Sequence, residues 1–302
     1  MLQFFKNPNF KIVDKRRFAF IFSVVIIAAG IVSLFIQGLN YGVDFAGGTK
    51  MQIKFDKEIS TEYLRDMIMT EEIGNPEIKS SGTREFMITL PILEDNSDAV
   101  EKMKSALSEL SYEVLQIDKI GPKIGVEMRT NSIKAVLIAL LLILIYITVR
   151  FEFKFAIGAV IALAHDVMIT LAFFSFFQWE ISLPVLAAFL TIVGYSLNDT
   201  IVVYDRIREN IKTHKGKPLE NVIDLSINQS LSRTVITSLT TFFVVLVLAV
   251  FGGQTLFGFS IAMVVGVIVG TYSSMFVASP VLVMWSHQFN EKDSKKVNKV
   301  KK

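Results

Sequence analysis

Six apolar runs, each about as long as a helix needs to cross a lipid bilayer, constrain this chain more than any other feature. A helix rises about 1.5 Å per residue, so roughly 20 apolar residues span a hydrocarbon core about 30 Å thick. Hydrophobic residues make up 52% of the 302-residue sequence. The runs cover residues 18–36, 133–149, 155–177, 183–204, 233–251 and 256–285. They predict an α-helical polytopic membrane protein with six transmembrane helices, the last of which tilts or ends at Pro280.

Basic residues are unevenly distributed among the connections between these runs. They are abundant in both tails and after the second and fourth runs, whereas the connections 178–182 and 252–255 contain none. By the positive-inside rule, this asymmetry predicts that both termini are cytoplasmic. Trp179 and Trp285 fall at run ends, where aromatic belts form. A cleavable signal peptide is an alternative for the first run, disfavoured because no small-residue cleavage site precedes Gln37.

These patterns divide the chain into five parts. We expect a cytoplasmic tail at 1–17, the first transmembrane helix at 18–37, an extracytoplasmic domain at 38–132, the other five helices with short loops at 133–285, and a basic cytoplasmic tail at 286–302.

The segment 38–132 has mixed charge and no long apolar run. Its patterns predict strands at 50–55, 78–80, 84–90 and 112–120, with helices at 60–68 and 95–110. This βαββαβ order is that of a small ferredoxin-like α+β domain between the first two membrane helices. The segment has no histidine and the whole chain has no cysteine, so we expect neither an enzyme active site nor a metal site.

Ionisable residues occur inside the apolar runs, at His165, Asp166, Asp199 and Arg233. A charge in the bilayer core is costly, and such residues usually face a bundle interior and mark an ion or proton path. Asp199 and Arg233 are expected at similar depth, because one run ends and the next begins on the same side. A buried carboxylate beside an arginine can titrate near neutral pH. The sequence therefore predicts a proton relay in which Asp199, next to Asn198, carries the proton.

Structural roles compete with this hypothesis. Arg233 also suits an end anchor whose charge snorkels to the interface, and His165 with Asp166 suits a static pair that ties helices together. The segment 219–230 is amphipathic and is expected to lie along the cytoplasmic interface. Gly266 and Gly270 form a GxxxG spacing, which predicts close helix packing.

Five segments together carry a family resemblance. They are Tyr41-Gly-Val-Asp-Phe-Ala-Gly-Gly-Thr49, Arg150-Phe-Glu-Phe-Lys-Phe155, Ala164-His-Asp-Val167, the long segment 193–210 and Ser230-Leu-Ser-Arg-Thr234. In content, order and spacing the chain resembles the SecD/SecF family of protein-export membrane proteins, within the resistance-nodulation-division superfamily. The segment 193–210 is the most specific of the five.

The resemblance implies a function and a set of partners. It implies a heterodimer with SecD in the bacterial cytoplasmic (inner) membrane, which uses the proton-motive force to assist late translocation of unfolded secretory polypeptides. The SecYEG channel is an implied partner, with YajC and YidC as further candidates. No nucleic acid and no cofactor other than the coupling protons are expected.

The resemblance also assigns residues. The family's intramembrane acid falls on Asp199 and its basic partner on Arg233, and a motif near the membrane exit falls on Asp44, Gly47 and Gly48. Two alternatives share this architecture: a proton-driven exporter of lipids or small molecules, and a passive scaffold of the translocon.

Overall fold

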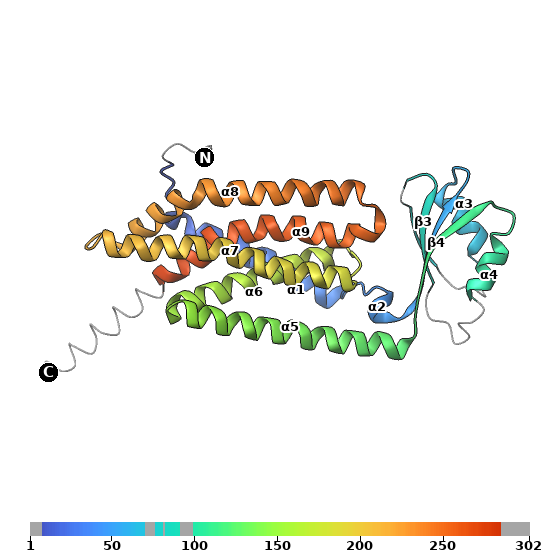
Figure 1. The fold of residues 1–302 in the computed structure, drawn as a ribbon, viewed down its shortest axis with the longest axis horizontal. Coiled ribbons are helices and arrows are strands. Elements are labelled where there is room, and N and C mark those ends of the chain that lie inside the picture. Colours follow the sequence, from blue (N-terminus) through green and yellow to red (C-terminus); the bar gives the residue numbers. More distant parts are fainter. Residues whose placement is uncertain (1–7, 70–75, 81, 91–98, 285–302) are drawn as a thin grey trace.

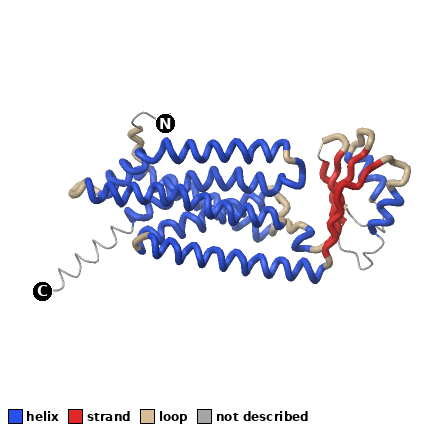
Figure 2. Tube along the Cα trace, viewed as in Figure 1, coloured by secondary structure: helices blue, strands red, loops and turns tan. Residues whose placement is uncertain are grey.

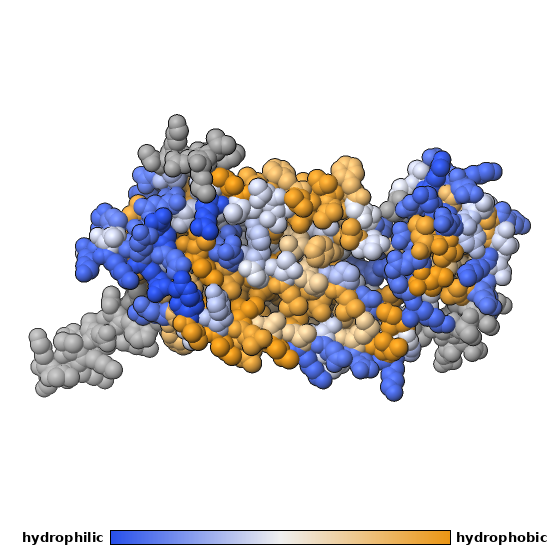
Figure 3. Space-filling view, in the orientation of Figure 1, coloured by the Kyte–Doolittle hydropathy of each residue, from blue (hydrophilic) through white to orange (hydrophobic). Residues whose placement is uncertain are grey.

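The chain separates into a long helical bundle and a small sheet domain at one end of it (Figure 1, Figure 2). A computed structural model describes residues 8–69, 76–80, 82–90 and 99–284. Within them, six helices are long and apolar enough to cross a membrane. The bundle contains α1 (Arg16–Ile36), α5 (Pro122–Arg150), α6 (Phe153–Phe176), α7 (Leu183–Thr213), α8 (Leu219–Phe251) and α9 (Gly253–Ser273). Figure 3 shows the bundle as an apolar band with hydrophilic regions at both ends. The predicted six-helix architecture is confirmed.

Helices α5, α7 and α8 extend well beyond the apolar runs that predicted them. Helix α5 begins at Pro122, so residues 122–132, which were expected in the soluble domain, form its first turns. Helix α7 continues to Thr213. Hydropathy detects only the part of a helix that lies in lipid, whereas backbone hydrogen bonding continues into water as long as the residues favour a helix.

The prediction of a separate interfacial segment at 219–230 is wrong. These residues are the first turns of the continuous helix α8. Their apolar side chains Val222, Ile223 and Ile227 are at most 2% exposed and pack inside the bundle. The amphipathic pattern is therefore satisfied by the protein core and not by a lipid surface.

Pro280 does not end the last helix, which continues to Met284. A π-helical turn, Ser274–Ala278, comes just before the proline. A wider turn of this kind accommodates a residue that cannot donate to the helical ladder. Side chains bond nearby carbonyl groups: Ser279 Oγ donates to Ser274 O over 2.9 Å, and Tyr204 OH donates to Ala278 O over 3.0 Å.

The sheet domain has the predicted ferredoxin-like plan. Its elements are β1 (Gly48–Phe55), α3 (Thr61–Ile68), β2 (Glu77–Ser80), β3 (Glu85–Leu90), α4 (Ala99–Ala106) and β4 (Tyr112–Ile120). The strands form an antiparallel sheet in the order β2-β3-β1-β4. Several predicted features lie partly or wholly outside the described residues: 1–7 of the first tail, Ser81 of the hairpin turn, 95–98 of the second helix, Trp285, and the tail at 286–302.

Local sequence accounts for these elements. In β1, Met51, Ile53 and Phe55 alternate with polar residues and are at most 1% exposed, facing α3 and α4. Ser60 caps α3, because its Oγ accepts a hydrogen bond from Tyr63 N over 3.2 Å. A one-turn helix that the sequence did not predict, α2 (Val43–Ala46), connects the membrane exit to β1.

Glycines set the closest helix contacts in the bundle. A Cβ added at Gly266 would lie 2.3 Å from the side chain of Ile192, so α9 packs against α7 only without a side chain there. Gly30 of α1 likewise faces Ala172 of α6. The packing role predicted for the GxxxG spacing is therefore present between α9 and α7.

Replacing Gly266 by valine should force α9 away from α7. Overpacking of this kind typically costs about 1–3 kcal/mol, so we expect a lower unfolding temperature of the purified chain in detergent, followed by intrinsic fluorescence. Gly194→Val is the matched control, because no atom lies within 4 Å of a Cβ built at Gly194. Equal unfolding temperatures of the two variants would contradict the close contact.

Candidate functional site

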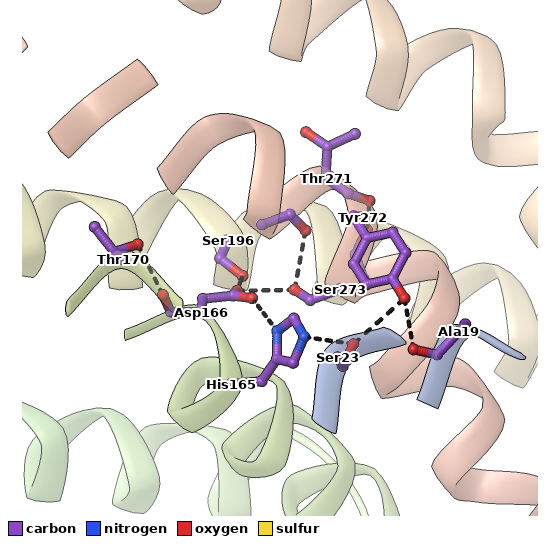
Figure 4. A network of polar contacts seen from close by, with 11 residues as sticks. Ala19, Ser23, His165, Asp166, Thr170, Ser196, Thr271, Tyr272 and Ser273 are labelled. Atoms are coloured by element: carbon purple, nitrogen blue, oxygen red, sulfur yellow. Dashed lines mark hydrogen bonds and ion pairs between the residues drawn. The ribbon is translucent and has the colours of Figure 1, made fainter. Parts of the chain in front are cut away.

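A buried polar network crosses the middle of the bundle around Asp166 (Figure 4). Asp166 is 0% exposed, and its Oδ1 lies 2.9 Å from Nδ1 of His165. Its Oδ2 accepts hydrogen bonds from Ser196 Oγ of α7 (2.5 Å) and Ser273 Oγ at the end of α9 (2.8 Å). One carboxylate thus joins three helices, and all of its oxygens are bonded.

The network continues from His165 to α1. Nε2 of His165 lies 2.9 Å from Ser23 Oγ, which lies 3.3 Å from the hydroxyl of Tyr272. That hydroxyl donates to the carbonyl of Ala19 over 2.9 Å. The rings of His165 and Tyr272 stack with their centroids 5.9 Å apart.

The number of available hydrogens limits which of these hydrogen bonds can form at the same time. Tyr272 donates to the Ala19 carbonyl, so Ser23 must donate to Tyr272 and must accept from Nε2 of His165. The contact between Nδ1 and Asp166 then needs a second proton, either on the imidazole or on the carboxyl group. All contacts are therefore satisfied together only when the His165–Asp166 pair holds one proton more than a neutral histidine beside a carboxylate.

Asp199 belongs to a second polar cluster, between α7, α8 and α9. It is 2% exposed, and its Oδ2 accepts a hydrogen bond from Ser238 Oγ over 3.2 Å. Thr271 Oγ1 lies 2.7 Å from that serine oxygen. Ser196 of α7 and Ser273 at the end of α9 belong to the first cluster, so both clusters use the same two helices at neighbouring positions.

The remaining predicted relay residues lie on the surface of this chain. Asn198 and Arg233 are exposed. Arg233 attracts the Asp199 carboxylate electrostatically but makes no ion pair within the described part of the chain. The structure therefore brings together His165 with Asp166, and Asp199 with Ser238, but it does not form a direct Asp199–Arg233 pair.

Sequence inspection missed the hydroxyl groups of both clusters. They are Ser23, Ser196, Ser238, Thr271, Tyr272 and Ser273. The run Thr271-Tyr-Ser-Ser274 inside an apolar segment was a usable signal. Ser238 lies in a second such run, Thr237-Ser-Leu-Thr-Thr241, whereas Ser23 of α1 stands alone among apolar residues and gave no signal.

The exit motif forms a joint between the sheet domain and the bundle. Oδ2 of Asp44 accepts a hydrogen bond from Leu183 N over 2.7 Å, at the start of α7. The helix dipole also stabilises a carboxylate at the N-terminal end of a helix. The motif thus fixes the first turn of the helix that carries Asp199.

Both glycines of this motif are required by the backbone. Gly47 and Gly48 have φ of 78° and 137°, which side-chain-bearing residues rarely adopt. A Cβ at Gly48 would lie 2.8 Å from the carbonyl oxygen of Leu90. Gly125 of α5 also packs closely against the motif, because a Cβ added there would lie 3.0 Å from Gly47 N.

Ion pairs and backbone bonds reinforce the joint from the connection between α6 and α7. Glu180 pairs with Lys50 of β1 at 3.1 Å and with Lys79 of β2 at 3.4 Å. Tyr41 and Ile181 form an isolated parallel bridge. The sheet domain is therefore linked to the bundle at the very connection that leads into α7.

Six membrane helices with two buried carboxylate clusters, joined by a glycine-rich motif to a small soluble domain, define a polytopic membrane protein of the transporter type. Two family models match the chain: "Protein export membrane protein SecD/SecF, C-terminal" at residues 99–288, and "SecD/SecF GG Motif" at residues 32–59. The chain belongs to the SecD/SecF family. The second model covers Asp44, Gly47 and Gly48 of the joint.

Individual relatives agree with this membership. The chain is 44% identical to protein translocase subunit SecF of Rhodothermus marinus over 292 residues, covering 93% of this chain and 95% of the relative. It is 40% identical to protein translocase subunit SecDF of Thermus thermophilus, over 96% of this chain but only 40% of the relative. The crystal structure of SecDF from that organism superposes with a TM-score of 0.83 at 39% identity, covering 93% of this chain and 39% of that one. The chain therefore spans about two fifths of the SecDF chain.

Replacing Asp44 by alanine should loosen the joint. Loss of a capping oxygen typically costs about 0.5–2 kcal/mol. We expect faster amide hydrogen exchange in the first turn of α7, whereas Asp44→Asn, which keeps an acceptor oxygen, should stay close to the wild type. Asp66→Ala on the exposed face of α3 is the control. Unchanged exchange at the start of α7 in Asp44→Ala would refute the capping role.

Proposed function

We propose that this chain is a subunit of the Sec protein-export machinery that acts with SecD and uses the proton-motive force to assist late translocation of secretory proteins. The observation that carries the proposal is Asp199, a carboxylate that is 2% exposed inside a membrane helix of a protein whose relatives are named translocase subunits. A buried carboxylate without a paired counter-ion is a group that gains and loses a proton at modest cost. The role is mechanical coupling and not enzymatic catalysis.

The surface of the bundle supports a partner in the membrane. Thr191, Gly194 and Asn198 of α7, with Arg233 and Thr240 of α8, are exposed on this chain although they lie in membrane-spanning helices. Polar groups facing lipid are unfavourable, so other helices are expected to cover them. Figure 3 shows a patch of intermediate hydropathy within the apolar band, on the face where α7 and α8 lie. This chain covers 40% of the SecDF relative, which is therefore more than twice as long. We propose that helices of SecD cover this face of α7 and α8.

The proposed cycle rests on the attraction between Asp199 and Arg233. A charged Asp199 attracts Arg233 towards the bundle, and a protonated Asp199 releases it. Because Asp44 holds the start of α7 and Glu180 holds the connection before it, a shift of α7 would move the joint with the sheet domain. The hydrogen-bonded pair His165–Asp166 is proposed as a second site on the proton path, with a static tie between helices as the alternative.

Orientation and further partners complete the proposal. We infer that the basic end of the bundle faces the cytoplasm of a bacterial cell, that the membrane is the inner membrane, and that the sheet domain lies outside it. The SecYEG channel, YajC, YidC and unfolded secretory polypeptides are proposed as partners from the family resemblance.

A proton-driven exporter of lipids or small molecules is the second candidate. A cavity of about 620 Å³ between the uncovered face of the sheet and the bundle favours it. Its lining residues include Lys50, Gln52, Asp118 and Ser182. Because the lining carries both charges, it suits a polar polypeptide segment at least as well as a lipid.

The test is export of a secretory client into inverted vesicles that contain this chain and SecD. We expect Asp199→Asn and Arg233→Met to reduce export to the level measured without a proton gradient, because an amide cannot gain and lose the proton and a thioether offers no positive charge for Asp199 to attract. A sodium gradient in place of the proton gradient identifies the coupling ion.

Glu209→Gln, at the exposed end of the same helix, is the control and should export like the wild type. Vesicles must contain equal amounts of each variant. If Asp199→Asn retains gradient-dependent export, the scaffold hypothesis replaces the proton-carrier hypothesis. If wild-type vesicles export no protein client but accumulate a lipid or small molecule, the exporter hypothesis replaces both.

A further inference from the structure

A second amphipathic cavity lies at the end of the bundle remote from the sheet domain. It has a volume of about 290 Å³ between the start of α6, the end of α7, the start of α8 and the end of the last helix. Its lining residues are Glu152, Lys154, Phe155, Ile207, Arg208, Ile211, Lys212, Leu219 and Leu282. None of them belongs to the carboxylate clusters or to the joint.

One side of this cavity is strongly basic. Lys154 and Lys212 are exposed and have no ion-pair partner among the described residues. Arg208 is only loosely held, at 3.4 Å from Asp205. Glu152 is the one acid in the lining, so three cations face a single carboxylate.

The other side of the cavity is apolar. Ile207 is 0% exposed and Phe155 is 6% exposed, whereas Ile211 is 41% exposed at the rim. Leu219 and Leu282 complete this wall. A soluble anion would gain nothing from such a wall, whereas a molecule with an anionic head and a hydrocarbon body uses both sides.

The position of the cavity matches the level of lipid headgroups. Lys154 is in the first turn of α6, and Lys212 is in the last turn of α7. Figure 3 shows the hydrophilic end of the bundle meeting the apolar band in this region. Lipid phosphates occupy this boundary in a bilayer, and basic pockets between membrane helices bind anionic headgroups there.

We propose that this cavity is a binding site for an anionic phospholipid. The phosphate contacts Lys154 and Lys212, and the glycerol and the first carbons of an acyl chain contact the apolar wall. A volume of about 290 Å³ is close to the lower limit of roughly 300 Å³ for ligand pockets, which suits this part of a lipid and not the whole molecule. The chain's own basic tail does not fit, because the lysines at 292, 295, 296, 299, 301 and 302 would meet like charges.

The test is native mass spectrometry of the full chain in detergent, titrated separately with phosphatidylglycerol, phosphatidylcholine and glycerol 3-phosphate. We expect phosphatidylglycerol to bind most tightly. Each basic group near an anionic lipid contributes a factor of about five in affinity, so Lys154→Gln with Lys212→Gln should weaken binding roughly 25-fold. Lys215→Gln with Lys217→Gln removes the same charge outside the cavity and should leave the affinity unchanged.

Glu152→Gln provides a test that a folding defect cannot imitate. It removes the single acid of the lining, so the affinity for phosphatidylglycerol should rise several-fold. The proposal is overturned if phosphatidylcholine binds as tightly as phosphatidylglycerol, or if the control pair weakens binding as much as the cavity pair. Tight binding of glycerol 3-phosphate would also overturn it, because the site would then serve a soluble anion.

Discussion

The absence of water inside a bilayer is the constraint on which the rest of this structure depends. Every backbone polar group at that depth must find its partner within the protein. The helices satisfy their own backbones, and hydroxyl groups such as Thr170 and Ser230 bond carbonyl groups one turn away. The carboxylates of Asp166 and Asp199 have no such local solution, so they collect donors from neighbouring helices and thereby determine how those helices pack.

The same constraint connects the bundle to the sheet domain. Helix α7 carries Asp199 in its middle and is capped at its start by Asp44. The cap belongs to the segment that leads from α1 into the sheet, and Glu180 pairs with two of the strands. A displacement of α7 along its axis therefore cannot leave the domain unaffected, which is the mechanical requirement of any coupling between a membrane site and an external domain.

The exposed polar stripe on α7 and α8 indicates that this chain is one part of a larger unit. Asn198 and Arg233 are unsuited to lipid, yet nothing in the described part of the chain covers them. A chain that aligns with two fifths of a SecDF protein has the size expected for such a part. The arrangement of Arg233 beside Asp199, without a direct pair, is consistent with a site that closes only next to a partner.

The sequence by itself determined the six helices, the ferredoxin-like domain and the presence of acids within membrane helices, because hydrophobic length, strand alternation and charge are local properties. It could not determine that α5 begins at Pro122 or that residues 219–230 are buried, since those depend on what the helices meet. That Ser196 and Ser273 donate to Asp166 could not be determined either, because the three residues lie far apart along the chain. Only tertiary packing decided which hydroxyl groups surround each carboxylate, because hydrogen-bond partners across helices depend on rotation and depth and not on spacing along the chain.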